Sequence, residues 1–179
     1  MVEPSSSPAA RILSVERLEA ALPRVIHFPR GMEDRSAHAW DLSNPAICQS
    51  EYWEDALCAD AVALGVSSAG DMHTENFLVR MIAFADEPTA AGHFRAWSTA
   101  TAKTAKPDGG VDGRAEYALP PSQGWEGRGV VLRQGAVITK VEYAWDGQEV
   151  PGRLEGATRM VTERVQQTLS GKNPTASMR

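Results

Sequence analysis

One stretch of the chain, Asn76 to Phe84, constrains the fold more than any other part of the sequence. It is the longest apolar run with the composition of a β-strand. Successive side chains of a strand point to opposite faces, so Phe77 and Val79 share one face while Leu78 and Arg80 share the other. Both faces are apolar apart from Arg80, which is typical of a central strand rather than an edge strand. The rest of the chain therefore has to supply the neighbouring strands and the layers that bury it.

Hydrophobic periodicity and turn residues predict further elements on both sides of this strand. Ala69-Gly70-Asp71 is expected to be the turn of an antiparallel hairpin, and a second hairpin is expected to turn at Gln134-Gly135. Segment 105–114, rich in Gly and Asp, is expected to be a loop. In chain order we expect a helix at 14–21, strands at 25–28, 37–40, 61–66 and around residue 78, a helix at 88–103, strands at 125–133 and 136–145, and a helix at 151–169.

This order of elements places the chain in the α+β class. Hairpins followed by helices imply a mainly antiparallel sheet of about five strands with helices packed on one face. We expect a single domain over residues 11–170, a flexible Ser/Pro linker at 1–10 and a polar tail at 171–179. On the helix-covered face Arg80 would need a partner such as Glu142. We expect it instead on the open face, where it reaches water or lines a cleft.

Composition excludes several functional classes. The chain has 179 residues, of which 42% are hydrophobic and 23% charged, as in an ordinary globular domain with a sizeable core. A formal net charge of -5 without a local Lys/Arg cluster argues against nucleic-acid binding. No apolar run approaches the roughly 20 residues that cross a bilayer. We therefore expect contact with a membrane only through an anchor that is absent from this chain.

The first residues, Met1 to Pro8, have neither the basic region nor the apolar region of a signal peptide. Two interpretations stay open. In the first, the chain starts natively at Met1 and is cytoplasmic. In the second, an export or anchoring segment has been removed, which leaves a Ser/Pro-rich linker before the folded domain.

Cys48 and Cys58 are the two cysteines of the chain. Their polar, irregular surroundings favour a disulfide, which would stabilise the fold by about 2–3 kcal/mol by closing the loop between them. The alternative is a pair of reduced core cysteines, as is common in cytosolic proteins. A zinc site is not indicated, because no further Cys/His pair accompanies them at metal-ligand spacing.

Asp71, His73 and Glu75 occupy alternate positions, so on a strand all three side chains would project from one face. Such a group could begin a metal or acid–base site, although His ligands usually need further donors. The alternative is a solvated strand start just after a turn. The sequence has no nucleophile elbow and no dinucleotide-binding fingerprint. We therefore expect no catalytic residues, no metal and no cofactor.

Four of the five tryptophans fall in loops or at strand ends. Aromatic side chains in such places often line a binding groove, and they also cap the open ends of sheets. Together with one arginine and one tyrosine of the expected sheet, they make up the candidate lining of a ligand-binding cleft: Trp40, Trp53, Arg80, Trp125, Tyr143 and Trp145.

Several short sequence segments together resemble one known family. A cysteine-bearing loop precedes a strand that ends in Ala83-Phe84-Ala85-Asp86, and Ala90-Ala91-Gly92-His93-Phe94 opens the next helix. Further along the chain come Trp125-Glu126-Gly127, the segment Val131 to Ile138 of the second expected hairpin, and a final amphipathic helix. From about Trp40 to Leu169 this arrangement resembles the PknH-like extracellular sensor domain, which is found on actinobacterial receptor kinases and related secreted lipoproteins.

The resemblance implies an extracytoplasmic α+β domain with helices packed on an antiparallel sheet and a cleft for an unknown ligand. Members usually have four cysteines in two disulfides, so only one bridge can be carried over, onto Cys48 and Cys58. The family has no established catalytic residues to transfer.

We therefore expect a non-catalytic ligand-binding or sensor-type domain at the outer face of the membrane, in a membrane-anchored or secreted lipoprotein. Its partner would be an unknown small ligand or a cell-envelope protein. One alternative is an enzyme or metal-dependent binder that uses Asp71, His73 and Glu75. The other is a protein–protein interaction module.

Overall fold

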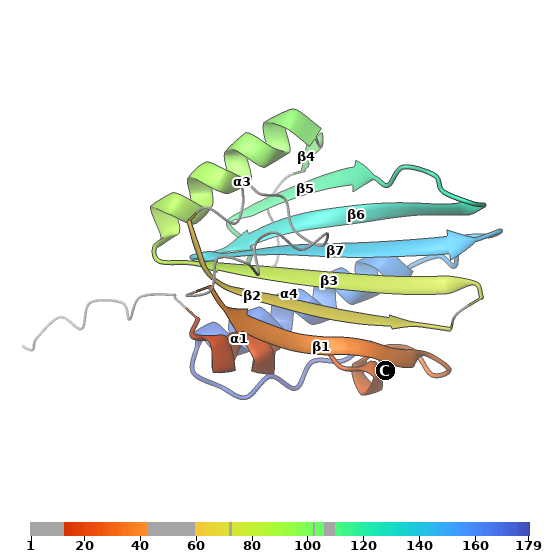
Figure 1. The fold of residues 1–179 in the computed structure, drawn as a ribbon, viewed down its shortest axis with the longest axis horizontal. Coiled ribbons are helices and arrows are strands. Elements are labelled where there is room, and N and C mark those ends of the chain that lie inside the picture. The colour runs from red at the N-terminus through yellow and green to blue at the C-terminus, as the bar shows by residue number, and fades with distance from the viewer. Residues whose placement is uncertain (1–12, 43–59, 72, 102, 106–109) are drawn as a thin grey trace, which may run out of the picture.

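The computed structural model describes residues 13–42, 60–71, 73–101, 103–105 and 110–179. Within these residues the chain forms one seven-stranded antiparallel sheet, in the order β1-β2-β3-β7-β6-β5-β4, with three α-helices (Figure 1). The predicted α+β class with a mainly antiparallel sheet is confirmed. No helix in this part of the chain is long and apolar enough to span a membrane. The elements are α1 (Val15–Ala21), the 3-10 helix η1 (Val25–His27), β1 (Glu33–Asp41), β2 (Ala61–Gly70), β3 (Glu75–Phe84), α3 (Glu87–Thr101), β4 (Lys103–Ala105), β5 (Gly113–Ala118), β6 (Trp125–Gln134), β7 (Val137–Asp146) and α4 (Arg153–Leu169).

Strand β3 lies in the middle of the sheet, between β2 and β7, as its composition predicts. Phe77, Val79 and Met81 on its first face and Ile82 and Phe84 on its second are all 0% exposed. Fully burying a large apolar side chain contributes about 1.5–3 kcal/mol, so this strand is a major source of the fold's stability. Both predicted hairpins are also confirmed, because β2 pairs with β3 and β6 pairs with β7 in antiparallel register.

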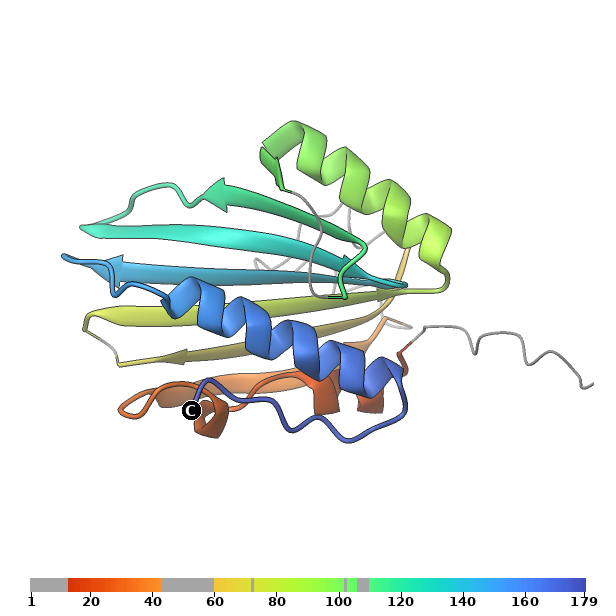
Figure 2. The same ribbon diagram turned by 180° about the vertical axis from the view of Figure 1, so that it is seen from behind.

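Helices cover both faces of the sheet, which corrects the expectation of helices on one face. Helices α1 and α4 pack on the first face, over Phe77 and Val79, and Figure 2 shows α4 crossing that face. Helix α3 packs on the second face, where Ala90 and Trp97 join a core cluster with Phe84. The reason is that β3 is apolar on both sides, so a single helical layer would leave one of its faces in water.

The number of strands also differs from the expected five. Strand β5 takes in the last two residues of the loop expected at 105–114 and continues through 115–118, for which no element was predicted. It pairs with β6 and β4 and extends the sheet beyond β6. Gly113 and Ala115 face α3, and a Cβ on Gly113 would lie 2.6 Å from the Phe94 ring. These inward residues are small because the helix packs closely on them. Their size hides the alternation by which a strand is recognised.

Two shorter segments differ as well. The edge strand expected at 37–40 runs from Glu33 to Asp41 as β1. Residues 25–28 form the 3-10 turn η1 instead of a strand, closed by hydrogen bonds from His27 N to Arg24 O (2.8 Å) and from Phe28 N to Val25 O (3.1 Å). Prolines at positions 23 and 29 bracket this segment and cannot donate to a ladder, so a short strand here has little to gain from pairing.

Residues 171–179, polar in composition, run back alongside α4 and pack against η1 (Figure 2). Met178 N donates to His27 O at 2.8 Å and Arg179 Nε donates to Phe28 O at 3.0 Å. The Met178 side chain packs against the first-face core. The segment therefore forms one wall of the region around η1.

Candidate functional site

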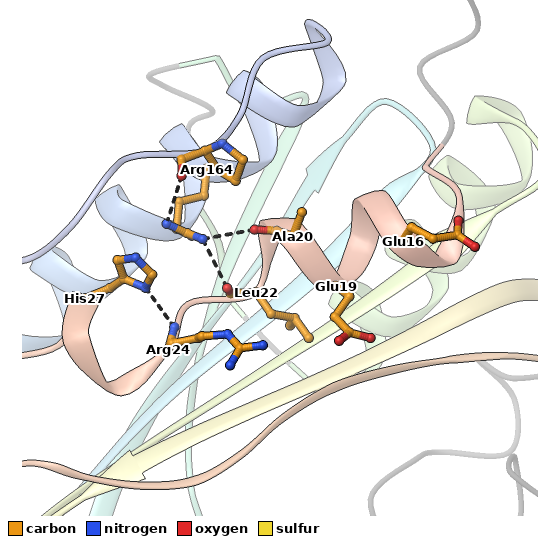
Figure 3. Close-up of a pocket in the computed structure, with 8 residues that line it drawn as sticks. Glu16, Glu19, Ala20, Leu22, Arg24, His27 and Arg164 are labelled. Carbon is orange, nitrogen blue, oxygen red and sulfur yellow. Dashed lines mark hydrogen bonds between the residues drawn. The ribbon is translucent and has the colours of Figure 1, made fainter.

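A pocket of about 470 Å³ opens between α1, η1, α4 and the segment that follows α4 (Figure 3). Its volume lies within the range of about 300–1,000 Å³ that is usual for small-molecule sites. The side chains around it carry charges of both signs with few large apolar groups. They belong to Glu16, Glu19, Ala20, Leu22, Arg24, His27, Arg164 and Pro174.

Arg164 lies where α4 meets α1, and only 3% of it is exposed. Its guanidinium donates five hydrogen bonds, all to backbone carbonyl oxygens, which leaves it little capacity to bind a ligand directly. A cation here also matches the negative end of the α1 dipole. Burial lowers the pKa of Arg164 from its ordinary value. The acceptors are Ala21 (2.9 Å), Ala20 (3.0 Å) and Leu22 (3.2 Å) at the end of α1, and Ala176 (3.2 Å) and Pro174 (3.5 Å) after α4.

The His27 ring lies between Arg24 and Arg164 (Figure 3). Its Nδ1 accepts a hydrogen bond from Arg24 N at 2.8 Å, so the neutral ring carries its proton on Nε2. Burial lowers the pKa of His27, and the charges of Arg164, Arg179 and Arg24 lower it further. His27 is therefore a neutral donor held in a positive environment.

Charge divides the pocket into a basic end and an acidic end (Figure 3). Arg24 and His27 form the basic end beside η1. Glu16 and Glu19, three residues apart on α1, supply the acidic side chains of the pocket, and Figure 3 shows the Glu16 carboxylate pointing away from His27. Glu19 Oε2 accepts from Ala39 N at 3.4 Å, which fixes that carboxylate against β1.

The structure does not gather the predicted cleft residues into one site. Tyr143 (0% exposed) and Trp145 (6%) belong to the first-face core beneath α1 and α4, with ring centroids 5.3 Å apart. Trp40 and Trp125 are half-buried, and the register of their strands turns both toward the second face. Trp53 lies outside the described residues, as do Cys48 and Cys58 and hence the expected disulfide.

Arg80 lies on the second face, and it is paired, so the expectation that it points from an open face into water is wrong. Its Nη1 lies 3.2 Å from Glu142 Oε1, which also accepts a 2.7 Å hydrogen bond from the Tyr117 hydroxyl. Next to this pair, Lys140 Nζ lies 4.8 Å from the centroid of the Trp97 ring. Arg80 and Glu142 are cross-strand diagonal neighbours on β3 and β7, which brings the opposite charges together on a half-buried surface.

Asp71, His73 and Glu75 do not share a strand face, because β3 begins only at Glu75. The Asp71 carboxylate caps the turn and accepts from the amides of His73 (3.0 Å), Thr74 (2.7 Å) and Glu75 (2.9 Å). Slight desolvation would raise the pKa of Asp71, but the Thr74 hydroxyl and these amides outweigh it and hold the pKa well below its usual range. His73 is exposed.

The Glu75 carboxylate is bound by two other side chains, those of Arg153 and Tyr143. Glu75 is 8% exposed, binds Arg153 Nε at 2.9 Å and accepts a 2.8 Å hydrogen bond from the Tyr143 hydroxyl. Across the described residues, no group of three or more His, Cys, Asp or Glu side chains is placed to hold a metal ion. The geometric basis of a metal or acid–base site at Asp71, His73 and Glu75 is therefore lost.

Sequence reasoning missed all of the charged residues that line the pocket. One signal was present: Arg164 falls at helical spacing within the apolar stripe of α4, between Val161 and Thr168. A charged residue on a buried stripe needs a partner and marks a special position. Arg24 and His27 had no such signal, because they lie on a short connection whose geometry depends on distant parts of the chain.

No family model matches the chain, and no curated protein matches it. One solved structure has a similar fold over nearly the whole chain. The chain is similar to the extracellular domain of PknH from Mycobacterium tuberculosis. That crystal structure aligns with a TM-score of 0.61 and 14% sequence identity, over 92% of this chain and 100% of the other. The comparison shows a PknH-like fold, as the resemblance in sequence predicted.

Proposed function

We propose that this chain is an extracytoplasmic, non-catalytic ligand-binding or sensor-type domain of a membrane-anchored or secreted lipoprotein. The observation that carries the proposal is the likeness in fold, over nearly the whole of both chains, to a domain whose description places it outside the cell. The sequence adds a Ser/Pro-rich first segment and two cysteines in polar surroundings, which suit a tethered domain in an oxidising compartment.

The pocket between α1, η1 and α4 is our proposed ligand site. Its volume and its convergent polar groups support this, because small-molecule sites combine a concave surface with a few placed polar side chains. Its position supports a sensor role as well. The walls come from four separate segments of chain, so a bound ligand would restrain their relative motion.

The compartment is tested with the complete gene product in the organism of origin, by protease treatment of intact cells and by mass spectrometry of the thiols. We expect digestion of the domain from outside the cell and a disulfide between Cys48 and Cys58. Protection in intact cells together with two free thiols would contradict the extracytoplasmic proposal.

Ligand binding is tested by thermal denaturation against a small-molecule collection, with the wild-type protein and Arg24→Gln. A ligand present at about 100 times its Kd should stabilise the fold by about 2.7 kcal/mol. The gain should shrink in Arg24→Gln and persist in Arg35→Gln, whose side chain is also exposed but lies on β1. A ligand whose effect is equal in both variants would place the site elsewhere.

A further inference from the structure

Within the described residues, the basic end of the pocket has hydrogen-bond donors without partners. The Arg24 guanidinium has no ion pair or hydrogen bond there, and the Nε2–H of His27 has no acceptor. In proteins, guanidinium and imidazole donors side by side are a common way to hold a carboxylate or phosphate oxygen.

The electrostatic environment of this end favours an anion. Three guanidinium groups, those of Arg164, Arg179 and Arg24, act on His27. This concentration of positive charge occurs in a chain whose formal net charge is -5. An anion placed here would gain from all three cations at once, and partial burial weakens solvent screening.

The acidic end imposes a second requirement. Glu16 and Glu19 line the same cavity, and a ligand with two negative charges would be repelled by one or both of them. Glu19 Oε2 is held by Ala39 N and lies 3.5 Å from His38 Nδ1, which leaves Oε1 available to the pocket. A cationic group at this end would complete the set of charges.

We propose that the pocket binds a small zwitterion, with its carboxylate against Arg24 and His27 and its ammonium group against Glu16 and Glu19. The ligand class is that of amino acids and short peptides. The inference rests on the proposed ligand-binding function and narrows it. Arg164 contributes positive potential and shapes the pocket, because its own donors are already bound to backbone carbonyls.

The experiment is a titration of the isotope-labelled protein, followed by the backbone amide resonances of α1 and residues 22–27. The probes are zwitterions of increasing length: glycine, β-alanine, γ-aminobutyrate, ε-aminocaproate and glycylglycine. Butyrate and butylamine each carry one of the two charges of γ-aminobutyrate, and inorganic phosphate tests a multiply charged anion. Each is added to about 10 mM, at which a site with a Kd of about 1 mM is about nine-tenths occupied.

We expect at least one zwitterion to shift both groups of resonances in a saturable way, and the single-charge analogue of its length to bind about tenfold more weakly or worse. Arg24→Gln and Glu19→Gln should each weaken the zwitterion about tenfold. Exposed residues of β1 supply the controls Arg35→Gln and Glu33→Gln, which should bind as the wild type does. If Glu19→Gln loosens β1, Glu16→Gln tests the same end without removing the hydrogen bond between Glu19 and Ala39 of that strand.

Two results would overturn the proposal that the ligand is a zwitterion. The first is tight binding of phosphate or butyrate at the pocket with no preference for a zwitterion, which would leave the ligand-binding function intact. The second is the absence of any shift at α1 and residues 22–27 with every probe. If the wider small-molecule collection also gives no stabilisation that depends on Arg24, then the proposed function fails with it.

Discussion

Replacement of Arg164 by methionine tests how the pocket region is held together. Methionine keeps an unbranched apolar stem of similar length, so the substitution removes mainly the guanidinium. Two of the lost hydrogen bonds are buried, those to Ala21 O and Leu22 O, and the other three are partly accessible to water. The carbonyls at the end of α1 would then lack their partner.

The expected cost follows from these contacts. A hydrogen bond to a charged group is worth about 1.5–3 kcal/mol when buried, and little when water can replace it. Two buried bonds give roughly 3–6 kcal/mol, and release of the desolvated guanidinium offsets about 1–2 kcal/mol of this. We therefore expect the free energy of unfolding of Arg164→Met to fall by about 2–4 kcal/mol, or roughly 5–15 °C in Tm for a domain of this size.

Urea denaturation of the wild type, Arg164→Met and Arg159→Met measures the effect. Arg159 is an exposed residue of the same helix, so its substitution controls for charge and helix propensity. Hydrogen exchange should quicken in α1 and residues 172–179 before it does in β3, because Arg164 joins those segments. If Arg164→Met and Arg159→Met lose equal stability, within about 0.5 kcal/mol, then the carbonyl cluster does not hold the region together.

Three further predictions concern the core and the pH dependence. Burial and the hydrogen bond to Glu75 raise the pKa of Tyr143 to about 12. The stability that the protonated Tyr143 hydroxyl contributes should therefore be lost as the pH rises from the ordinary pKa of 10.0 to about 12. Tyr143→Phe should remove the last step of a spectroscopic tyrosine titration. His27 has a lowered pKa, so the folded state binds fewer protons than the unfolded one, and stability should decline as pH falls below its ordinary value of 6.5; His27→Gln should lessen this decline in pH-dependent melting. Gly129→Ala would place a Cβ 2.3 Å from the Tyr117 ring and displace its hydroxyl, which should cost about 1–3 kcal/mol in urea denaturation, whereas a cost near zero would mean that the ring moves freely.

The parts of the fold that were predictable are those with a strong local signal. The central strand shows its type because it is apolar on both faces, and the second hairpin shows its turn through Gly135, which has a φ of 59°. The first hairpin turns directly after Gly70, the last residue of β2. The three helices were found within about two residues of their ends for the same reason. In α4, for example, the stripe that contains Leu154, Val161 and Val165 repeats at helical spacing.

What could not be predicted depends on distant partners. Pairing of β3 with β7 joins segments about 60 residues apart and has no local signature. Arg80 illustrates the consequence. The sequence suggested Glu142 as the partner that Arg80 would need on a helix-covered face, but which faces the helices cover depends on packing between distant segments. The prediction of a cleft failed for Tyr143 for the same reason, because α4 covers that face and buries the ring.

Arg164 also links stability to ligand binding, so its substitution is expected to change both. The residue joins α4 to α1 and to residues 174–176, and these segments are walls of the pocket. A ligand that binds only the assembled walls stabilises them by mass action, and loss of the Arg164 contacts should therefore weaken any such ligand whatever its charge. Arg164→Met consequently cannot identify the ligand class. Arg24 can, because it is exposed and makes no side-chain hydrogen bond or ion pair with α1 or α4 within the described residues. Its substitution therefore changes the charge of the basic end without removing a polar contact between the walls.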